Sequence, residues 1–256
     1  LLGVCLLLGG CQERTDVADA YDVYATSDTY QLTESSTEKS ISLLGQDLCV
    51  GGTENTAAAD GIDTDYAQSA AVFSVQDEEI TYAQNIYQRM YPASTTKILT
   101  AYLALKYGNL DDLVTVSEYA AKQASDSSVC GLKAGDVVSL HDLLYGMMLK
   151  SGNDAAIAIA EHLSGSVEAF ADLMNARAKE LGCTNTHFVN PNGLNSDQQY
   201  TTCRDMAKIA AAAFANQTLC QIDSTLSYKF PATKAAAART ITPGHKMLYP
   251  NDSRYY

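Results

Sequence analysis

A serine and a lysine lie one helical turn apart in the segment Ser94-Thr95-Thr96-Lys97. Residues three positions apart share one face of a helix, so the two side chains can meet. A serine hydroxyl becomes a good nucleophile when a base takes its proton, and a lysine can be that base if burial or nearby positive charge lowers its pKa. The start of a helix also supplies backbone N–H groups that could stabilise an oxyanion. Alone the pattern is weak evidence, because a capped helix with an exposed lysine has the same sequence.

A second group of polar residues, Ser151-Gly152-Asn153, lies between two expected helices. A tight turn there could direct both side chains into a cleft, where Ser151 could relay a proton to a leaving amine. Asn153 offers a donor and acceptors that could hold a substrate amide. Taken by itself, this segment is better explained as an ordinary helix–turn–helix junction with Ser and Asn caps.

The expected elements place both groups at helix ends. Apolar residues recur at helical spacing over residues 94–107, and Gly108 is a typical stop. Two runs separated by a polar turn, residues 69–75 and 80–84, predict an antiparallel hairpin, and strands are expected again after Ser227. The pattern predicts further helices over residues 140–149, 154–163, 167–181 and 202–214, the last capped by Thr202. These elements indicate an α+β domain.

In combination, four segments closely resemble the low-molecular-mass D-alanyl-D-alanine carboxypeptidases, which are penicillin-binding proteins of serine peptidase family S11. They are, in order, residues 91–97 (YPASTTK), 151–156 (SGNDAA), 188–194 (FVNPNGL) and 200–206 (YTTCRDM). The resemblance runs from about Ser69 to Tyr256. It implies a β-lactamase/DD-peptidase-like transpeptidase fold, in which an antiparallel sheet packs with a helical subdomain.

The same resemblance implies roles for the candidate residues. Ser94 would be the acyl-enzyme nucleophile, Lys97 its proton acceptor and Ser151 the proton relay, while Asn153 would bind substrate. The substrate would be a peptidoglycan stem peptide ending in D-Ala-D-Ala, and β-lactams would be inhibitors that acylate the same serine. No metal or cofactor is implied. Residues 190–194 and 200–205 are expected to brace the site structurally.

One motif of the family is absent from the 256 residues. A Lys-Thr-Gly strand supplies the cation for the substrate carboxylate, but here Lys234 is followed by two alanines and Lys246 by Met247-Leu248. In relatives the motif follows shortly after a stretch like residues 251–256. We therefore expect that the C-terminal strands are missing and that the catalytic domain, residues 65–256, is incomplete.

The N-terminal segment indicates export and lipidation. Residues 1–10 resemble the end of a truncated lipoprotein signal peptide, and Leu8-Gly9-Gly10-Cys11 resembles a lipobox, in which the cysteine receives a diacylglycerol. Two acyl chains hold a protein stably on a membrane. Residues 11–64, which are rich in Ser, Thr, Asp, Glu and Gly, would then be a lipidated flexible tether on the outer face of the bacterial cell membrane.

Composition excludes several other classes. The net charge of −13 argues against nucleic acid, which needs a basic face. The four histidines form no H-E-x-x-H pattern, so we expect structural roles for them. Five cysteines follow Cys11 without C-x-x-C spacing, which makes zinc unfavourable and favours buried free thiols over a disulfide. They are Cys49, Cys130, Cys183, Cys203 and Cys220.

Two other functions are compatible with the motifs. A class A β-lactamase shares the S-x-x-K and S-x-N elements but needs a glutamate for deacylation, and residues 182–195 contain none. A non-catalytic wall-binding or β-lactam-sensing lipoprotein could keep the fold without turnover. The intact set of Ser94, Lys97, Ser151 and Asn153 argues against such decay.

Overall fold

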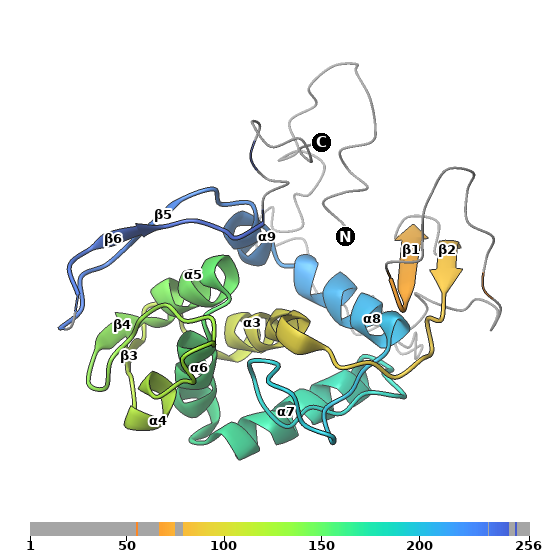
Figure 1. Cartoon of the computed structure of the whole chain (residues 1–256), viewed down its shortest axis with the longest axis horizontal. Helices are drawn as coiled ribbons and strands as arrows, with labels where there is room; N and C mark the ends of the chain where they lie inside the picture. The colour runs from red at the N-terminus through yellow and green to blue at the C-terminus, as the bar shows by residue number, and fades with distance from the viewer. Residues whose placement is uncertain (1–54, 56–66, 75–78, 235, 246–248, 250–256) are drawn as a thin grey trace, which may run out of the picture. The chain divides into compact units, whose positions relative to one another are not determined.

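The computed structural model describes residue 55 and residues 67–74, 79–234, 236–245 and 249 (Figure 1). These residues belong to one compact unit, Leu43–Tyr256. The expected signal peptide, Cys11 and, apart from Asn55, the expected tether lie outside the described residues. No helix in the described part of the chain is long and apolar enough to cross a membrane.

A buried helix, α3 (Thr96–Tyr107), lies at the centre of the helical region (Figure 1). It packs against α5 (Leu140–Lys150), α6 (Asn153–Ser164), α7 (Val167–Glu180), α8 (Cys203–Phe214) and α9 (Gln217–Asp223). Leu99, Ala101 and Leu103 are fully buried, and Thr96 and Lys97 at its start are buried as well. A helix enclosed in this way holds its first turn in a fixed place relative to its neighbours.

The five helices predicted from periodicity are confirmed, with one change at the start of α3. Residues Ala93–Thr95 form a 3-10 turn, η1, and the α-helix begins at Thr96, so Ser94 lies just before the helix proper. Gly108 ends α3 as expected. The Thr202 cap is also confirmed, because its hydroxyl accepts the backbone N–H of Asp205 at 3.1 Å.

The strands form three two-stranded antiparallel sheets within the described residues. β1 (Ala70–Ser74) pairs with β2 (Glu79–Gln84) as predicted, with a bulge between Val72 and Phe73. β5 (Tyr228–Phe230) and β6 (Arg239–Ile241) are the expected return to strands. The sequence did not predict α4 (Glu118–Ala121) or the pair formed by β3 (Leu113–Thr115) and β4 (Val137–Ser139). The α+β class is confirmed.

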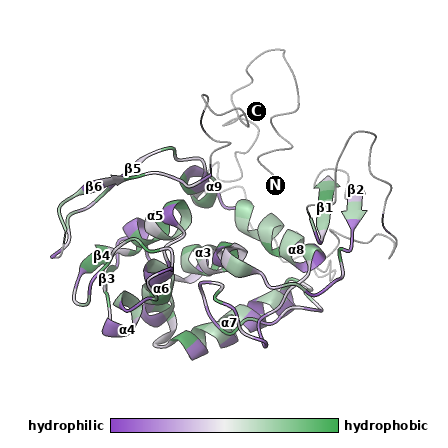
Figure 2. Cartoon of the chain, in the orientation of Figure 1, coloured by the Kyte–Doolittle hydropathy of each residue, from purple (hydrophilic) through white to green (hydrophobic). Residues whose placement is uncertain are grey.

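Two hydrophobic clusters meet at α3. One contains Leu143, Met147 and Ile159 of α5 and α6, and the other contains Phe170 and Met174 of α7. Figure 2 shows α7 with hydrophilic and hydrophobic residues mixed along it, whereas α8 is largely hydrophobic. α7 is amphipathic, and an outer helix of this kind buries only its apolar face. The core therefore fixes α3 from several sides.

The described cysteines are not uniformly buried. Cys130 is buried as expected, and Cys183 and Cys203 are half-buried. Cys220 is exposed, so the expectation of burial is wrong for this residue, which lies on the short helix α9. Within the described ranges, no group of three His, Cys, Asp or Glu side chains could hold a metal ion.

Candidate active site

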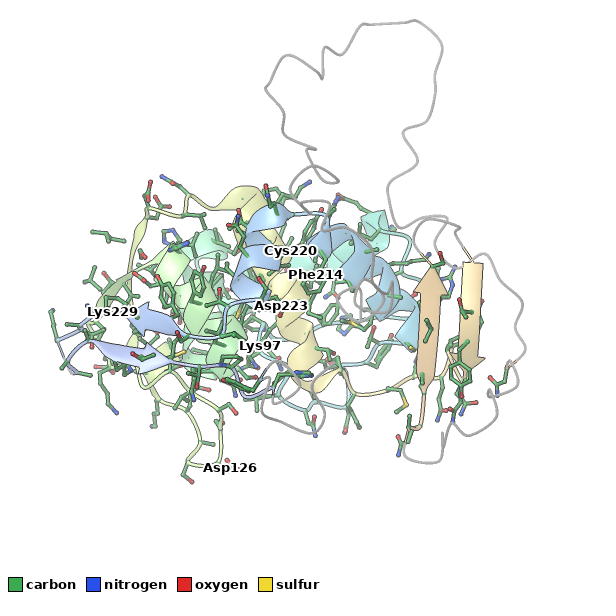
Figure 3. All side chains as sticks on the ribbon, turned by 90° about the horizontal axis from the view of Figure 1, so that it is seen from above. Lys97, Asp126, Phe214, Cys220, Asp223 and Lys229 are labelled. Carbon is green, nitrogen blue, oxygen red and sulfur yellow. The ribbon has the colours of Figure 1, made fainter. Side chains whose placement is uncertain are left out.

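The structure brings Ser94 and Lys97 together at the start of α3. Lys97 Nζ lies 3.1 Å from Ser94 Oγ. The lysine is only 3% exposed, and Figure 3 shows its side chain among the helices near the start of α3. Ser94 remains exposed. A reachable hydroxyl thus has a buried amine behind it.

The Ser151-Gly152-Asn153 turn reaches the same place from the junction of α5 and α6. Ser151 Oγ donates to Ser94 Oγ at 3.0 Å, and Asn153 Oδ1 accepts from Lys97 Nζ at 2.8 Å. Ser151 ends α5 with a left-handed backbone, and Asn153 is the first residue of α6. All four candidate residues that lie in the described part of the chain therefore form one cluster.

Burial sets the electrostatics of the cluster. Desolvation lowers the pKa of Lys97 from 10.5 to about 8, against the opposing effects of Cys130 and Asp154. The amine also contacts the backbone carbonyl of Asn192 at 2.7 Å. A neutral amine could donate its two N–H bonds to the Asn153 and Asn192 oxygens and accept the Ser94 hydroxyl proton with its lone pair. The geometry would allow a proton to pass from Ser94 to a neutral Lys97.

The Asn192 carbonyl is a part of the site that the sequence did not assign. Residues 190–194 were expected only to brace the site, and Thr100 does donate to the Pro191 carbonyl at 2.7 Å. The neighbouring Asn192 carbonyl contacts Lys97 itself. The Pro/Gly content of the segment predicts a turn, but no side-chain type reveals which backbone oxygen faces the amine.

Gly193 lets this turn approach the nucleophile closely. Its φ is +89°, and a Cβ there would lie 1.8 Å from the Ala93 carbonyl oxygen. Ala93, directly before Ser94, and Ser151 also have positive φ values, 47° and 53°. Non-glycine residues in this region store backbone strain, which is held only where surrounding packing enforces it. Two of the strained positions thus adjoin or belong to the cluster.

A family model described as D-alanyl-D-alanine carboxypeptidase matches residues 53–247. The chain is 42% identical over 151 residues to the D-alanyl-D-alanine carboxypeptidase DacA of Haemophilus influenzae, covering 57% of this chain and 38% of that protein. It is 40% identical over 168 residues to DacC of Escherichia coli, covering 62% of this chain and 41% of that protein. The chain thus spans about two fifths of the length of these curated relatives.

Solved structures give the same result. The Streptomyces K15 DD-transpeptidase matches with a TM-score of 0.63 and 32% identity, covering 69% of this chain and 73% of that one. The D-alanyl-D-alanine carboxypeptidase DacD of Francisella tularensis matches with a TM-score of 0.64 and 36% identity, covering 74% and 46% of the two chains. The expected DD-peptidase fold is confirmed by these neighbours.

Substitution of Gly193 should disturb the site through the backbone. We expect Gly193→Ala to lower the free energy of unfolding by about 2–4 kcal/mol, because a Cβ adds overpacking to an unfavourable left-handed conformation. Gly165→Ala is the matched control, since Gly165 also has positive φ but has open space around it. It should cost only about 1 kcal/mol. Urea unfolding of both variants measures the difference, and equal losses would contradict the close approach at Gly193.

Burial of Lys97 should appear in the pH dependence of stability. Because the pKa is about 8 in the folded protein and 10.5 when unfolded, the unfolded state binds more protons between these values. The free energy of unfolding of the wild type, relative to Lys97→Met, should therefore rise by about 2–3 kcal/mol from pH 7 to pH 10. Subtracting the variant removes the contribution of other titrating groups. Parallel urea-unfolding profiles would show that the amine is not desolvated.

Proposed function

Because this chain belongs to the D-alanyl-D-alanine carboxypeptidase family, we propose that it carries the nucleophile of a serine D-Ala-D-Ala carboxypeptidase. Such an enzyme removes the terminal D-alanine from peptidoglycan stem peptides. The observation that carries the proposal is the position of Ser94 Oγ, 3.1 Å from the buried amine of Lys97 and 3.0 Å from the hydroxyl of Ser151. One partner can accept a proton from Ser94, and the other can pass one to a leaving group.

In the proposed acylation step, Ser94 Oγ attacks the carbonyl carbon between the two terminal D-alanines. Its proton passes to neutral Lys97, which is the general base. Backbone N–H groups at the helix start favour the developing oxyanion. When the C–N bond breaks, D-alanine leaves with a proton delivered through Ser151. Water then hydrolyses the ester, which releases the shortened peptide and restores Ser94.

Asn153 has two proposed tasks in this scheme. Its Oδ1 accepts a hydrogen bond from Lys97, which orients the amine toward Ser94. Its amide N–H group can at the same time donate to a substrate carbonyl. An aspartate at this position could hold the lysine but could not donate to the substrate, and it would favour the charged lysine.

The proposed substrate and inhibitors place the protein outside the cytoplasm. Stem peptides of peptidoglycan are extracytoplasmic, and β-lactams would acylate Ser94 as substrate analogues. We further propose that a lipid on Cys11 anchors the protein to the outer face of the bacterial cell membrane. The proposed steps use no metal ion, cofactor or nucleic acid.

Intact mass of the purified gene product with benzylpenicillin tests the nucleophile. We expect a long-lived penicilloyl adduct that peptide mapping places on Ser94, and no adduct in Ser94→Ala. The wild type should also release D-alanine from a D-Ala-D-Ala peptide. An adduct that vanishes in seconds would indicate a β-lactamase. The absence of any adduct would indicate a non-catalytic wall-binding module, and a lasting adduct without release of D-alanine would indicate a β-lactam sensor.

The base can be tested separately with Lys97→Arg. A guanidinium keeps the positive charge but does not lose its proton, so acylation of Ser94 should slow by about 10²-fold or more. Lys106→Arg is the matched control, because Lys106 is an exposed lysine on the same helix. Its acylation rate should equal that of the wild type. A Lys97→Arg rate close to wild type would remove Lys97 from the proposed role.

A further inference from the structure

A buried carboxylate lies directly behind the cluster, at a residue to which the proposed mechanism gives no task. Asp154 follows Asn153 in the first turn of α6 and is 1% exposed. Its neighbour Asn153 holds the Lys97 amine at 2.8 Å. A carboxylate is costly to bury unless hydrogen bonds satisfy it, so the donors around Asp154 indicate what it does.

Four backbone N–H groups donate to Asp154, and the Cys130 thiol also forms a side-chain hydrogen bond with it. Oδ1 accepts from Cys130 at 2.8 Å and from Ala155 at 2.9 Å. Oδ2 accepts from Gly131 and Leu132, each at 2.9 Å. Three of these four donors belong to consecutive residues of the loop between α4 and β4. One side chain of α6 therefore organises a loop that is remote in sequence.

A second tie joins the same loop to the active-site turn. The backbone N–H of Asn153 donates to the Ser128 carbonyl at 2.8 Å. The tip of the loop lies apart from the helices: Figure 3 shows that Asp126 projects away from them. The loop is thus tied at its base, residues 128–132, where it meets the start of α6.

The base of the loop also fills the space beneath the turn. Added Cβ atoms on Gly152 and Gly146 would lie 2.3 Å and 2.6 Å from Cys130 Sγ, so the thiol occupies room that these two glycines leave. On its other side, Arg239 of β6 donates to the Cys130 carbonyl at 2.5 Å. The loop base packs between α5, the Ser151 turn and the β5–β6 pair. A shift of the loop base would therefore displace the turn.

We propose that Asp154 is a positioning residue for acylation: by tying the loop base to the start of α6, its carboxylate holds Ser151 and Asn153 at the distances at which they meet Ser94 and Lys97. Among the described contacts Asp154 forms no hydrogen bond to Ser94 or Lys97, although its charge raises the pKa of Lys97 and so opposes the effect of burial. This inference rests on the proposed function, because it assigns a task within the acylation of Ser94. Small displacements of Ser151 or Asn153 would disturb proton transfer, and a displaced Asn153 would also weaken its contact with the substrate.

Asp154→Asn tests the proposal with little change in size. The amide oxygen can replace one carboxylate oxygen, but the amide N–H₂ group would face two backbone N–H groups and leave them without an acceptor. Acylation of the purified gene product by benzylpenicillin is followed over a range of concentrations. We expect the limiting acylation rate of the folded protein to fall at least tenfold, and the half-saturating concentration to change by a smaller factor, because a displaced Asn153 also weakens substrate binding.

Asp136→Asn is the matched control. Asp136 is a fully buried aspartate just after the loop base, and its carboxylate accepts a hydrogen bond from the backbone N–H of Lys133 at 2.9 Å. Among the described contacts it forms no hydrogen bond to residues 151–154. Its limiting acylation rate should stay within about twofold of wild type. If Asp154→Asn lowered only the amount of active protein and left the limiting rate unchanged, Asp154 would be structural alone. The proposal would then be wrong.

Amide hydrogen exchange of the wild type covers the case in which Asp154→Asn does not fold. The backbone amides of Cys130, Gly131 and Leu132 should exchange as slowly as amides within α6, and the amide of Asp126, which is exposed at the loop tip, should exchange faster. Rapid exchange at all three positions would overturn the tie to Asp154. This measurement does not depend on acylation. A wild-type protein that fails to react with penicillin would count against the proposed function, but the exchange test of the Asp154 hydrogen bonds would still be valid.

Discussion

The site depends on keeping a lysine amine out of water. Lys97 is 3% exposed, and its desolvation lowers its pKa to about 8. Hydrogen bonds to the oxygens of Ser94, Asn153 and Asn192 partly offset the free-energy cost of burying the amine. At pH 7 an amine with a pKa of about 8 is neutral in about a tenth of the molecules, whereas one with the ordinary pKa of 10.5 is neutral in roughly one in several thousand, so burial makes the base far more available. The chemistry that we propose is therefore a direct consequence of where α3 is buried.

Three separate segments must meet for this burial to occur. The η1–α3 segment supplies Ser94 and Lys97, the α5–α6 junction supplies Ser151 and Asn153, and the turn at Asn192 supplies a backbone carbonyl. The approach is close enough that Gly193 has no space for a side chain. The positive φ values of Ala93 and Ser151 are part of the same arrangement, since packing must hold the backbone in conformations that it would otherwise leave.

The sequence predicted the parts of this structure that have strong periodicity or characteristic side chains. The helices from α5 to α8 agree with the apolar spacing, and Ser94, Lys97, Ser151 and Asn153 were chosen for their chemistry. The strands β3 and β4 were not predicted, because three residues are too few to show an alternating pattern. The contact of the Asn192 carbonyl with Lys97 was not predicted either, because a backbone oxygen has no sequence signature. Asp154 was visible only as an acidic residue at a helix start, and its three loop donors depend on tertiary structure.

The protonation state of Lys97 is the central claim, and NMR of the ¹³C- and ¹⁵N-labelled lysine side chains measures it directly. Comparison with Lys97→Arg assigns the Lys97 signals, and their chemical shifts are followed from pH 6 to pH 11. The structure predicts a titration midpoint near pH 8 for Lys97, well below the ordinary lysine value of 10.5. A midpoint near 10.5 would mean that the amine is charged when substrate binds, and it would contradict Lys97 as the base for Ser94.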